Sequence, residues 1–195
     1  MYLKRICIII CLCALLTSFA YGKTEKDSTI KLLIEAGAGY GLSTDTLTKA
    51  GSRYGVSGVL RFLVKPDYRL RFGLETGWLH IASYERDSIK NEFGTSSVDA
   101  SLKAIPVMLV FSMNLSKWYM NTGLGYYYVI SSISAFGESV TDARWNIGFY
   151  LSLSYVFKLN EYLDLYPELK WNSIGEIGKT LLSAQISLSY SLFKW

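Results

Sequence analysis

The chain has 195 residues, which is the size of one domain, and half of them are hydrophobic. A formal net charge of +4 is too small to indicate a nucleic-acid partner, and one histidine with three cysteines cannot supply a metal site. We therefore expect no nucleic acid, no metal and no cofactor.

Residues 1–22 have the pattern of a secretory signal peptide. Lys4 and Arg5 precede an apolar run, and small residues that suit cleavage follow it. The mature domain, residues 23–195, then keeps 18 basic and 16 acidic residues. All the cysteines lie in the signal segment, so this domain must be stabilised by burial or by closure of a sheet rather than by disulfides.

Eight stretches of the mature chain alternate between apolar and polar residues. A period of two is that of a β-strand, because successive side chains point to opposite sides of a sheet. The stretches are 30–40, 56–65, 69–78, 102–113, 118–130, 145–157, 163–171 and 182–192. The stretch 102–113 is apolar on both faces, so its two sides cannot be told apart. The pattern predicts an all-β chain.

The last stretch has the sharpest contrast between its faces. One face is small and polar, with Ser183, Gln185, Ser187, Ser189 and Ser191. The other face is apolar from Leu182 to Leu192. This alternation is longer than the usual strand of a soluble protein, so a tall apolar wall has to be covered by protein or by lipid.

The connections between the stretches alternate in length. Short ones at 65–67, 114–117 and 158–161 fall between longer ones at 43–53, 83–99, 131–143 and 172–180. Short turns at one end of a sheet and long loops at the other are typical of transmembrane barrels. The sequence therefore predicts an eight-stranded antiparallel up-and-down transmembrane β-barrel.

Aromatic side chains support this topology. If the first strand runs outward, one group falls at the outer strand ends: Tyr40, Tyr54, Trp78, Trp145 and Trp171. A second group falls at the inner ends: Tyr68, Trp118, Phe157, Tyr162 and Tyr190. Rings gather in this way at the two interfaces of a bilayer. We expect the cell outer membrane, with its lipid and lipopolysaccharide, to surround the barrel.

A soluble lipocalin-like barrel would show the same alternation after a signal peptide, with its apolar face turned inward around a ligand. The polar face here is dominated by Gly and Ser, which suit the crowded interior of a narrow barrel, while the apolar face is bulky. These proportions favour lipid on the outside.

Two prolines, Pro106 and Pro167, fall within predicted strands. A proline cannot donate a ladder hydrogen bond, and a closed barrel has no edge on which to place it. We expect a β-bulge at each proline.

The chain resembles the small eight-stranded outer-membrane barrels of the OmpA and OmpX kind, and most of all the PorT-type barrels of Bacteroidetes. The likeness covers the mature chain and rests on AGAGYGL (36–42), NTGLGYYY (121–128), LKAIPVMLVF (102–111) and YSLFKW (190–195). It implies that the C-terminal aromatic residues are the signal read by the barrel-insertion machinery. The matching positions are Tyr190, Phe193 and Trp195, although Lys194 before a final Trp departs from the usual ending.

The alternation directs nine charged side chains into the barrel: Lys31, Glu35, Arg61, Arg69, Arg71, Glu75, Asp164, Glu168 and Lys170. Eight strands leave an interior that side chains can fill, and unpaired buried charges are costly. We expect these five cations and four anions to pair and plug the lumen. The alternative is a narrow porin-like channel for a solute.

Some small outer-membrane barrels modify lipid A with a His and a Ser two residues apart on the outer rim. His80 lies near that rim, but Ala82 occupies the second position, and Ser83 faces the other way if the strand continues. We expect no catalysis and assign no catalytic residue.

Segment 83–99 is the longest predicted loop and carries four acidic and two basic residues. Loops on a rigid barrel often carry function, so this segment is the candidate contact for a surface partner. The sequence as a whole predicts an outer-membrane protein with a structural or surface-interaction role.

Overall fold

The computed structural model describes residues 30–43, 52–66, 69–91, 94–135, 138–175 and 178–194. The predicted signal peptide, residues 1–22, lies outside these described residues. Within them, no helix has the length and apolar character needed to cross a membrane.

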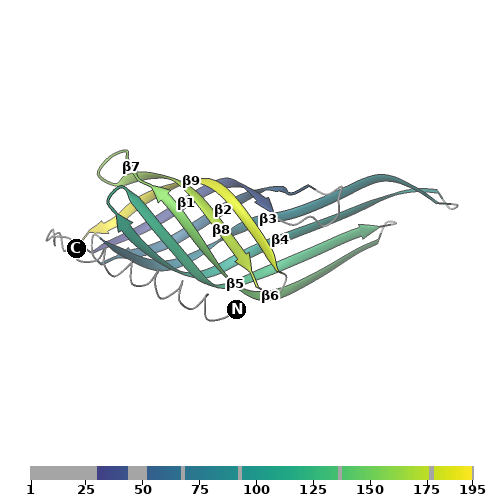
Figure 1. Ribbon diagram of the computed structural model, residues 1–195, viewed down its shortest axis with the longest axis horizontal. Helices are drawn as coiled ribbons and strands as arrows, with labels where there is room; N and C mark the ends of the chain where they lie inside the picture. Colours follow the sequence, from purple (N-terminus) through teal and green to yellow (C-terminus); the bar gives the residue numbers. More distant parts are fainter. Residues whose placement is uncertain are drawn as a thin grey trace, which may run out of the picture.

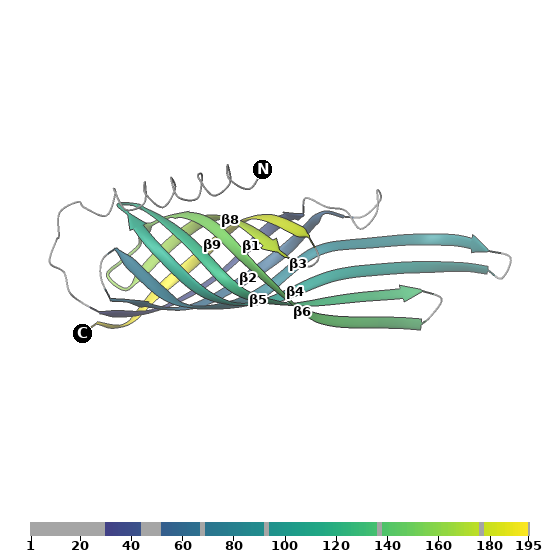
Figure 2. The same ribbon diagram turned by 60° about the horizontal axis from the view of Figure 1, so that its bottom comes forward.

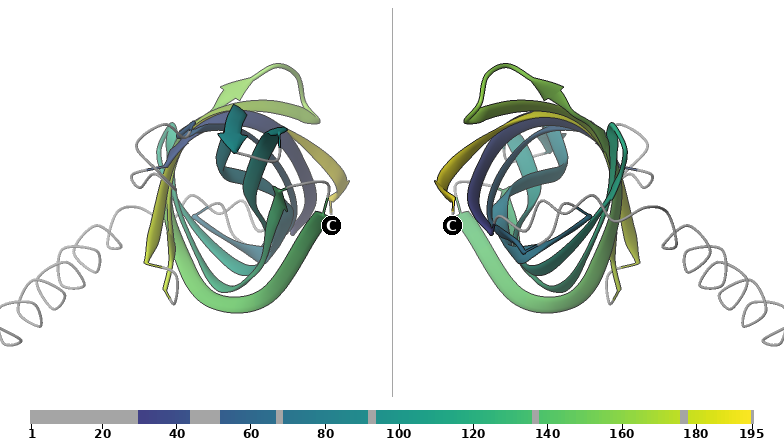
Figure 3. Two further views of the ribbon diagram at one scale, coloured as in Figure 1. Left: turned by 90° about the vertical axis from the view of Figure 1, so that its right-hand side faces the viewer. Right: turned by 90° about the vertical axis from the view of Figure 1, so that its left-hand side faces the viewer.

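The strands form one antiparallel sheet that closes into a barrel (Figure 1, Figure 3). They are β1 (Lys31–Ser43), β2 (Tyr54–Lys65), β3 (Leu70–Asn91), β4 (Gly94–Leu115), β5 (Trp118–Ala135), β6 (Glu138–Tyr155), β7 (Phe157–Lys158), β8 (Leu163–Ile174) and β9 (Lys179–Lys194). β9 pairs with β1, and β6 pairs with β8, which closes the ring. β7 is a two-residue strand beside β8, so eight strands make the wall. The predicted eight-stranded up-and-down barrel is confirmed.

The side chains of β9 identify the inside of the barrel. Ser183 and Ser187 are buried, whereas Leu182 and Ile186 are 41% and 59% exposed on the outer surface. A continuous apolar band on the outside of a closed sheet is unfavourable in water and favourable in lipid. The apolar face therefore points toward the bilayer and the serines point into the lumen.

β4 contains the stretch whose two faces are both apolar. Val107, Leu109 and Phe111 are about half exposed on the outer wall. Met108 and Val110, which alternate with them, are buried in the lumen. Both faces of this strand are thus apolar because one contacts lipid and the other fills the apolar part of the barrel interior.

The two prolines are not accommodated by bulges, so that prediction is wrong. Pro106 pairs with Tyr127 of β5 in regular register. On its other side, the β3–β4 register is the same before and after the proline, with Leu79 opposite Ala104 and Thr76 opposite Val107. The missing N–H therefore leaves a gap in one ladder without the insertion of an extra residue.

Pro167 interrupts the seam that closes the barrel. It pairs with Ile186 of β9 in regular register. On the other side of β8, pairing with β6 stops at Glu168 and pairing with β7 begins at Leu165. β7 is therefore the continuation of β6 beyond a short gap in the ladder opposite the proline.

Two of the segments predicted as long loops are strands. β3 and β4 stay paired as far as Asn91, so 83–99 is mostly a hairpin. β5 and β6 stay paired as far as Ala135, so 131–143 is a hairpin as well. Both hairpins extend beyond the barrel on the same side (Figure 2). Their polar composition suggested loops, but strands that leave the membrane need no apolar face.

Aromatic rings lie at both ends of the apolar band. At the outer end, Tyr40 stacks on Tyr54 with ring centres 6.0 Å apart. At the inner end, the rings of Tyr162 and Tyr190 lie 6.5 Å apart. Tyr68, another predicted member of the inner group, lies outside the described residues. These pairs occupy the positions of the two interfacial belts of a transmembrane barrel.

We expect Leu124→Arg to destabilise the barrel in lipid by about 2–4 kcal/mol, because charged side chains on the lipid face are most costly near the middle of the bilayer. Leu124 is 60% exposed and lies between the two belts on β5. Val140→Arg on the projecting part of β6 is the matched control and should change stability by less than about 0.5 kcal/mol. Urea titration in phospholipid vesicles, followed by tryptophan fluorescence, measures both. Equal effects would contradict the outward placement of the apolar face.

Candidate functional site in the barrel lumen

Six charged side chains meet inside the barrel, and none is more than 4% exposed. They are Glu35, Arg61, Arg71, Glu75, Glu168 and Lys170, which we call the lumen charge cluster. Register brings part of the cluster together, because Glu35 of β1 lies opposite Arg61 of β2, which lies opposite Glu75 of β3. The alternation of each strand turns these side chains inward, and β8 adds the remaining acid and the lysine.

Arg61 is the centre of the cluster and contacts all three acids. Its Nε donates to Glu75 Oε2 at 2.6 Å. Its Nη1 and Nη2 donate to the two oxygens of Glu168, each at 2.8 Å, in a bidentate pair. Nη1 also lies 3.4 Å from Glu35 Oε2. Since Glu168 belongs to β8, this pair crosses the lumen and joins strands that are not neighbours in the sheet.

The other two cations each combine an ion pair with an aromatic face. Arg71 Nη1 donates to Glu35 Oε1 at 2.8 Å, and its guanidinium lies 3.5 Å from the ring centre of Tyr119. Lys170 Nζ donates to Glu75 Oε1 and lies 3.9 Å from the ring centre of Tyr150. Such cation–π contacts are strongest where water is excluded.

Tyrosine rings fill much of the remaining lumen. Tyr127 and Tyr150 are completely buried, and two glycines make room for them. A Cβ at Gly123 would lie 2.1 Å from the Tyr150 ring, and one at Gly148 would lie 2.7 Å from the Tyr127 ring. The inward glycines thus allow large rings to cross a narrow barrel.

The cluster is electrically balanced, with three carboxylates against two guanidinium groups and one ammonium group. Buried charges are tolerated when they are paired and their remaining donors and acceptors are satisfied. Gln185 Nε2 supplies one such contact by donating to Glu168 Oε2 at 2.7 Å. The cluster therefore links opposite sides of the wall across the lumen, and it occupies the space through which a solute would pass.

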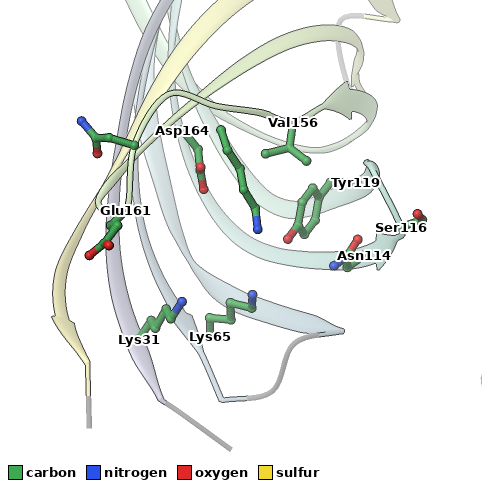
Figure 4. A pocket seen from close by; sticks show the side chains of 10 residues that line it. Lys31, Lys65, Asn114, Ser116, Tyr119, Val156, Glu161 and Asp164 are labelled. Atoms are coloured by element: carbon green, nitrogen blue, oxygen red, sulfur yellow. The ribbon is translucent and has the colours of Figure 1, made fainter. Parts of the chain in front are cut away.

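Three of the nine predicted lumen residues lie outside the cluster. Lys31 and Asp164 are partly exposed and line a cavity of about 660 Å³ at the inner mouth of the barrel (Figure 4). Arg69 lies just before β3, between the strands rather than within one. The Lys31 and Asp164 side chains thus line the mouth of the barrel instead of joining the buried cluster.

The predicted C-terminal signal lies on the outer wall. Tyr190 and Phe193 are 49% and 55% exposed, although an odd spacing of three would place them on opposite faces. A register shift between Leu32 and Leu33 of β1, where β9 passes from Ser191 to Phe193, brings them to the same side. Trp195 lies outside the described residues.

Gln185 was predicted on the polar face of the last stretch, but no uncharged side chain was predicted to contact the lumen charge cluster. Asn121 and Gln185 both contact Glu168, and Tyr119 and Tyr150 cover the cations. Asn121 and Gln185 could have been found, because they lie at inward positions of alternating strands. The contacts that each of these side chains makes could not have been predicted, since they depend on which strands lie side by side or face each other across the barrel.

The expectation that Ser83 faces away from His80 is wrong. The β3–β4 register shifts between His80 and Ala82, so that His80 opposite Lys103 and Ser83 opposite Ser101 fall on one face. Within the described residues no hydrogen bond joins the two side chains, and no set of three His, Cys, Asp or Glu could hold a metal ion.

We expect Glu168→Gln to destabilise the barrel by about 3–5 kcal/mol, because it removes the bidentate partner of Arg61 and leaves the buried cluster with one uncompensated positive charge. Glu138→Gln at the exposed tip of β6 is the control and should have no measurable effect. Urea titration in vesicles again measures both variants. A Glu168→Gln barrel as stable as the control would contradict a stabilising role for the cluster.

Three solved structures resemble this barrel. A major outer membrane protein from Thermus thermophilus has a TM-score of 0.57 and 14% identity, with 84% of this chain and 99% of that chain covered. Neisserial surface protein A, NspA, has a TM-score of 0.53 and 13% identity, with coverage of 83% and 97%. Ail of Yersinia pestis, in complex with the heparin analogue sucrose octasulfate, has a TM-score of 0.52 and 8% identity, with coverage of 84% and 98%.

No protein-family model matches the chain, and no curated protein matches it in sequence. At these identities the three structural likenesses establish the fold and nothing finer. The chain has the fold of the small eight-stranded outer-membrane β-barrels.

Proposed function

We propose that the mature chain is an integral outer-membrane protein that presents a projecting β-sheet as an interaction surface outside the cell. The single observation that carries this proposal is that four strands of the barrel continue beyond the wall while their outer neighbours do not. The barrel, with its packed lumen, is then the rigid membrane base for that sheet.

The projecting sheet is built from β3, β4, β5 and β6. β4 and β5 are paired as far as Val98 opposite Ala135. The β2–β3 ladder ends at Leu79, apart from one bridge farther out, and the β6–β8 ladder ends at Gly148. Beyond those points β3 and β6 are the two edges of an open sheet.

The edge formed by residues 138–146 of β6 is the better candidate for contact. In the described part of the chain these residues pair with β5 alone, so the other side of the strand presents backbone N–H and C=O groups without a sheet partner. Val140 is 70% exposed and Trp145 is 57% exposed on this strand. An exposed edge of this kind recruits an extended segment of another protein by β-strand addition.

The sequence prediction placed a surface partner on segment 83–99, and the proposal extends that contact to the whole sheet. Outer-membrane lipid and lipopolysaccharide would surround the wall, and the barrel-insertion machinery would read the end of β9. The insertion role is supported by the neighbouring outward positions of Tyr190 and Phe193. We also propose that the chain is related to the PorT-type barrels. The small-residue strands at 36–42 and 121–128 support this relationship.

Truncation of the β5–β6 tip tests the proposal. We expect removal of 133–140, with Ser132 and Thr141 joined by an Asn-Gly turn, to weaken binding by at least about tenfold, because several main-chain hydrogen bonds to the partner are lost. Val140→Thr is the matched control, since it keeps the edge and should bind normally. Adhesion of cells that express each form to a panel of immobilised host-surface and matrix proteins measures the effect.

Heat-modifiable mobility on a gel shows that each variant has folded. Binding that survives truncation at full strength would contradict the edge as the contact. A purely structural role would be favoured if the wild-type protein binds nothing in the panel and if cells without the protein have an envelope that is more sensitive to detergent.

The filled lumen argues against the porin-like alternative. We expect the wild-type protein in planar bilayers to show no stable current steps, because buried tyrosines and the lumen charge cluster occupy the interior. A wide porin inserted under the same conditions is the positive control. Reproducible open steps from the wild-type barrel would overturn the packed lumen and favour a channel.

A further inference from the structure

The inner mouth of the barrel is hollow, unlike its middle. A cavity of about 660 Å³ opens there (Figure 4), at the opposite end of the barrel from the projecting sheet (Figure 2). Its walls carry Lys31 of β1, Lys65 of β2 and Lys158 of β7, with Glu161 and Asp164 as acidic neighbours. The mouth therefore carries more positive than negative charge, in contrast to the balanced cluster above it.

The lysines are arranged without the counterions that the rest of the lumen provides. Lys31 and Lys65 are directly opposite each other in the β1–β2 ladder, a position in which like charges repel. Within the described residues no ion pair joins Lys31, Lys65 or Lys158 to a carboxylate. In Figure 4 the Lys31 and Lys65 side chains extend into the same cavity, with Asp164 farther up its wall.

A smaller cavity of about 50 Å³, which we call the neck, shares Lys31, Lys65 and Asp164 with the first cavity, and its lining also includes Arg71 of the lumen charge cluster. Arg71 is only 3% exposed, and its Nε has no hydrogen-bond partner, although its Nη1 is paired with Glu35. The Ser191 hydroxyl on the same neck is buried and unpartnered as well. Buried donors without partners are costly, and a ligand or water that accepts from them would relieve that cost.

We propose that this inner mouth is a binding site for a phosphate group. Lys31, Lys65 and Lys158 would neutralise its charge, and the neck would supply further donors beyond it. Phosphate carries up to two negative charges on compact oxygens, which matches several converging ammonium groups better than a single carboxylate does. Asp164 opposes binding, and its removal strengthens it. The site is independent of the projecting sheet.

Two sources can bring this chemistry to the inner side of the outer membrane: a soluble phosphate or the headgroup of an inner-leaflet phospholipid. The test uses the full mature barrel, refolded in maltoside micelles that contain no phosphate. One arm titrates inorganic phosphate by calorimetry, and the other titrates dihexanoyl phosphatidylglycerol. Binding in the first arm assigns soluble phosphate, and binding in the second arm alone assigns the lipid headgroup.

We expect the triple variant Lys31→Gln, Lys65→Gln, Lys158→Gln to weaken binding by on the order of tenfold or more, since three charge-assisted contacts are lost. Asp164→Asn should tighten binding severalfold. Lys103→Gln is the matched control, because its ammonium lies 5.6 Å from the Trp78 ring, away from the mouth, and the affinity should not change. All variants are first checked for heat-modifiable mobility. No binding by the wild type in either arm, or equal weakening in the Lys103→Gln control, would overturn the proposal.

Discussion

Closure of the sheet between β6 and β8 is the constraint on which the rest of the structure depends. In a bilayer every backbone N–H and C=O must be paired within the protein, so the wall cannot have an edge. Seven register pairs, from Gly148 opposite Ile174 to Ser154 opposite Glu168, make that seam. Pro167 lies immediately beyond the last of these pairs, about midway between Tyr162 of the inner belt and Trp171 of the outer belt, and the ladder resumes at Leu165 opposite Phe157 of β7.

A ring of eight strands leaves little room inside, and this explains why charges and tyrosines can share the lumen. Arg61 of β2 reaches Glu168 of β8 across the interior, and Lys170 of β8 reaches Glu75 of β3. These pairs act as braces between strands that share no hydrogen bonds. The same ion pairs that brace the wall also occupy the lumen, so one arrangement of side chains stabilises the barrel and fills its interior.

The two ends of the barrel can differ because only the part of the sheet that lies in lipid has to form a closed ring. Outside, β3 to β6 continue as an open sheet whose edges water can solvate, and the edge of β6 there is the surface that we propose for contact. Inside, the strands stop within a short distance of the interface and leave a hollow mouth lined by lysines. The two proposed sites, the projecting sheet and the inner mouth, therefore lie at the ends of the barrel. The packed middle stabilises the fold.

The sequence by itself determined the number of strands, their alternation and the direction of each face, except in the stretch 102–113, which is apolar on both sides. The serines of β9 and the inward glycines encode that orientation locally, because a period of two can be read one strand at a time. Only the tertiary structure decided that Arg61 meets Glu168, that 83–99 is a hairpin, that β4 turns Val107 outward and that Lys31 faces Lys65. These features depend on the register between strands far apart in the chain, and register is a property of the closed sheet and not of any one strand.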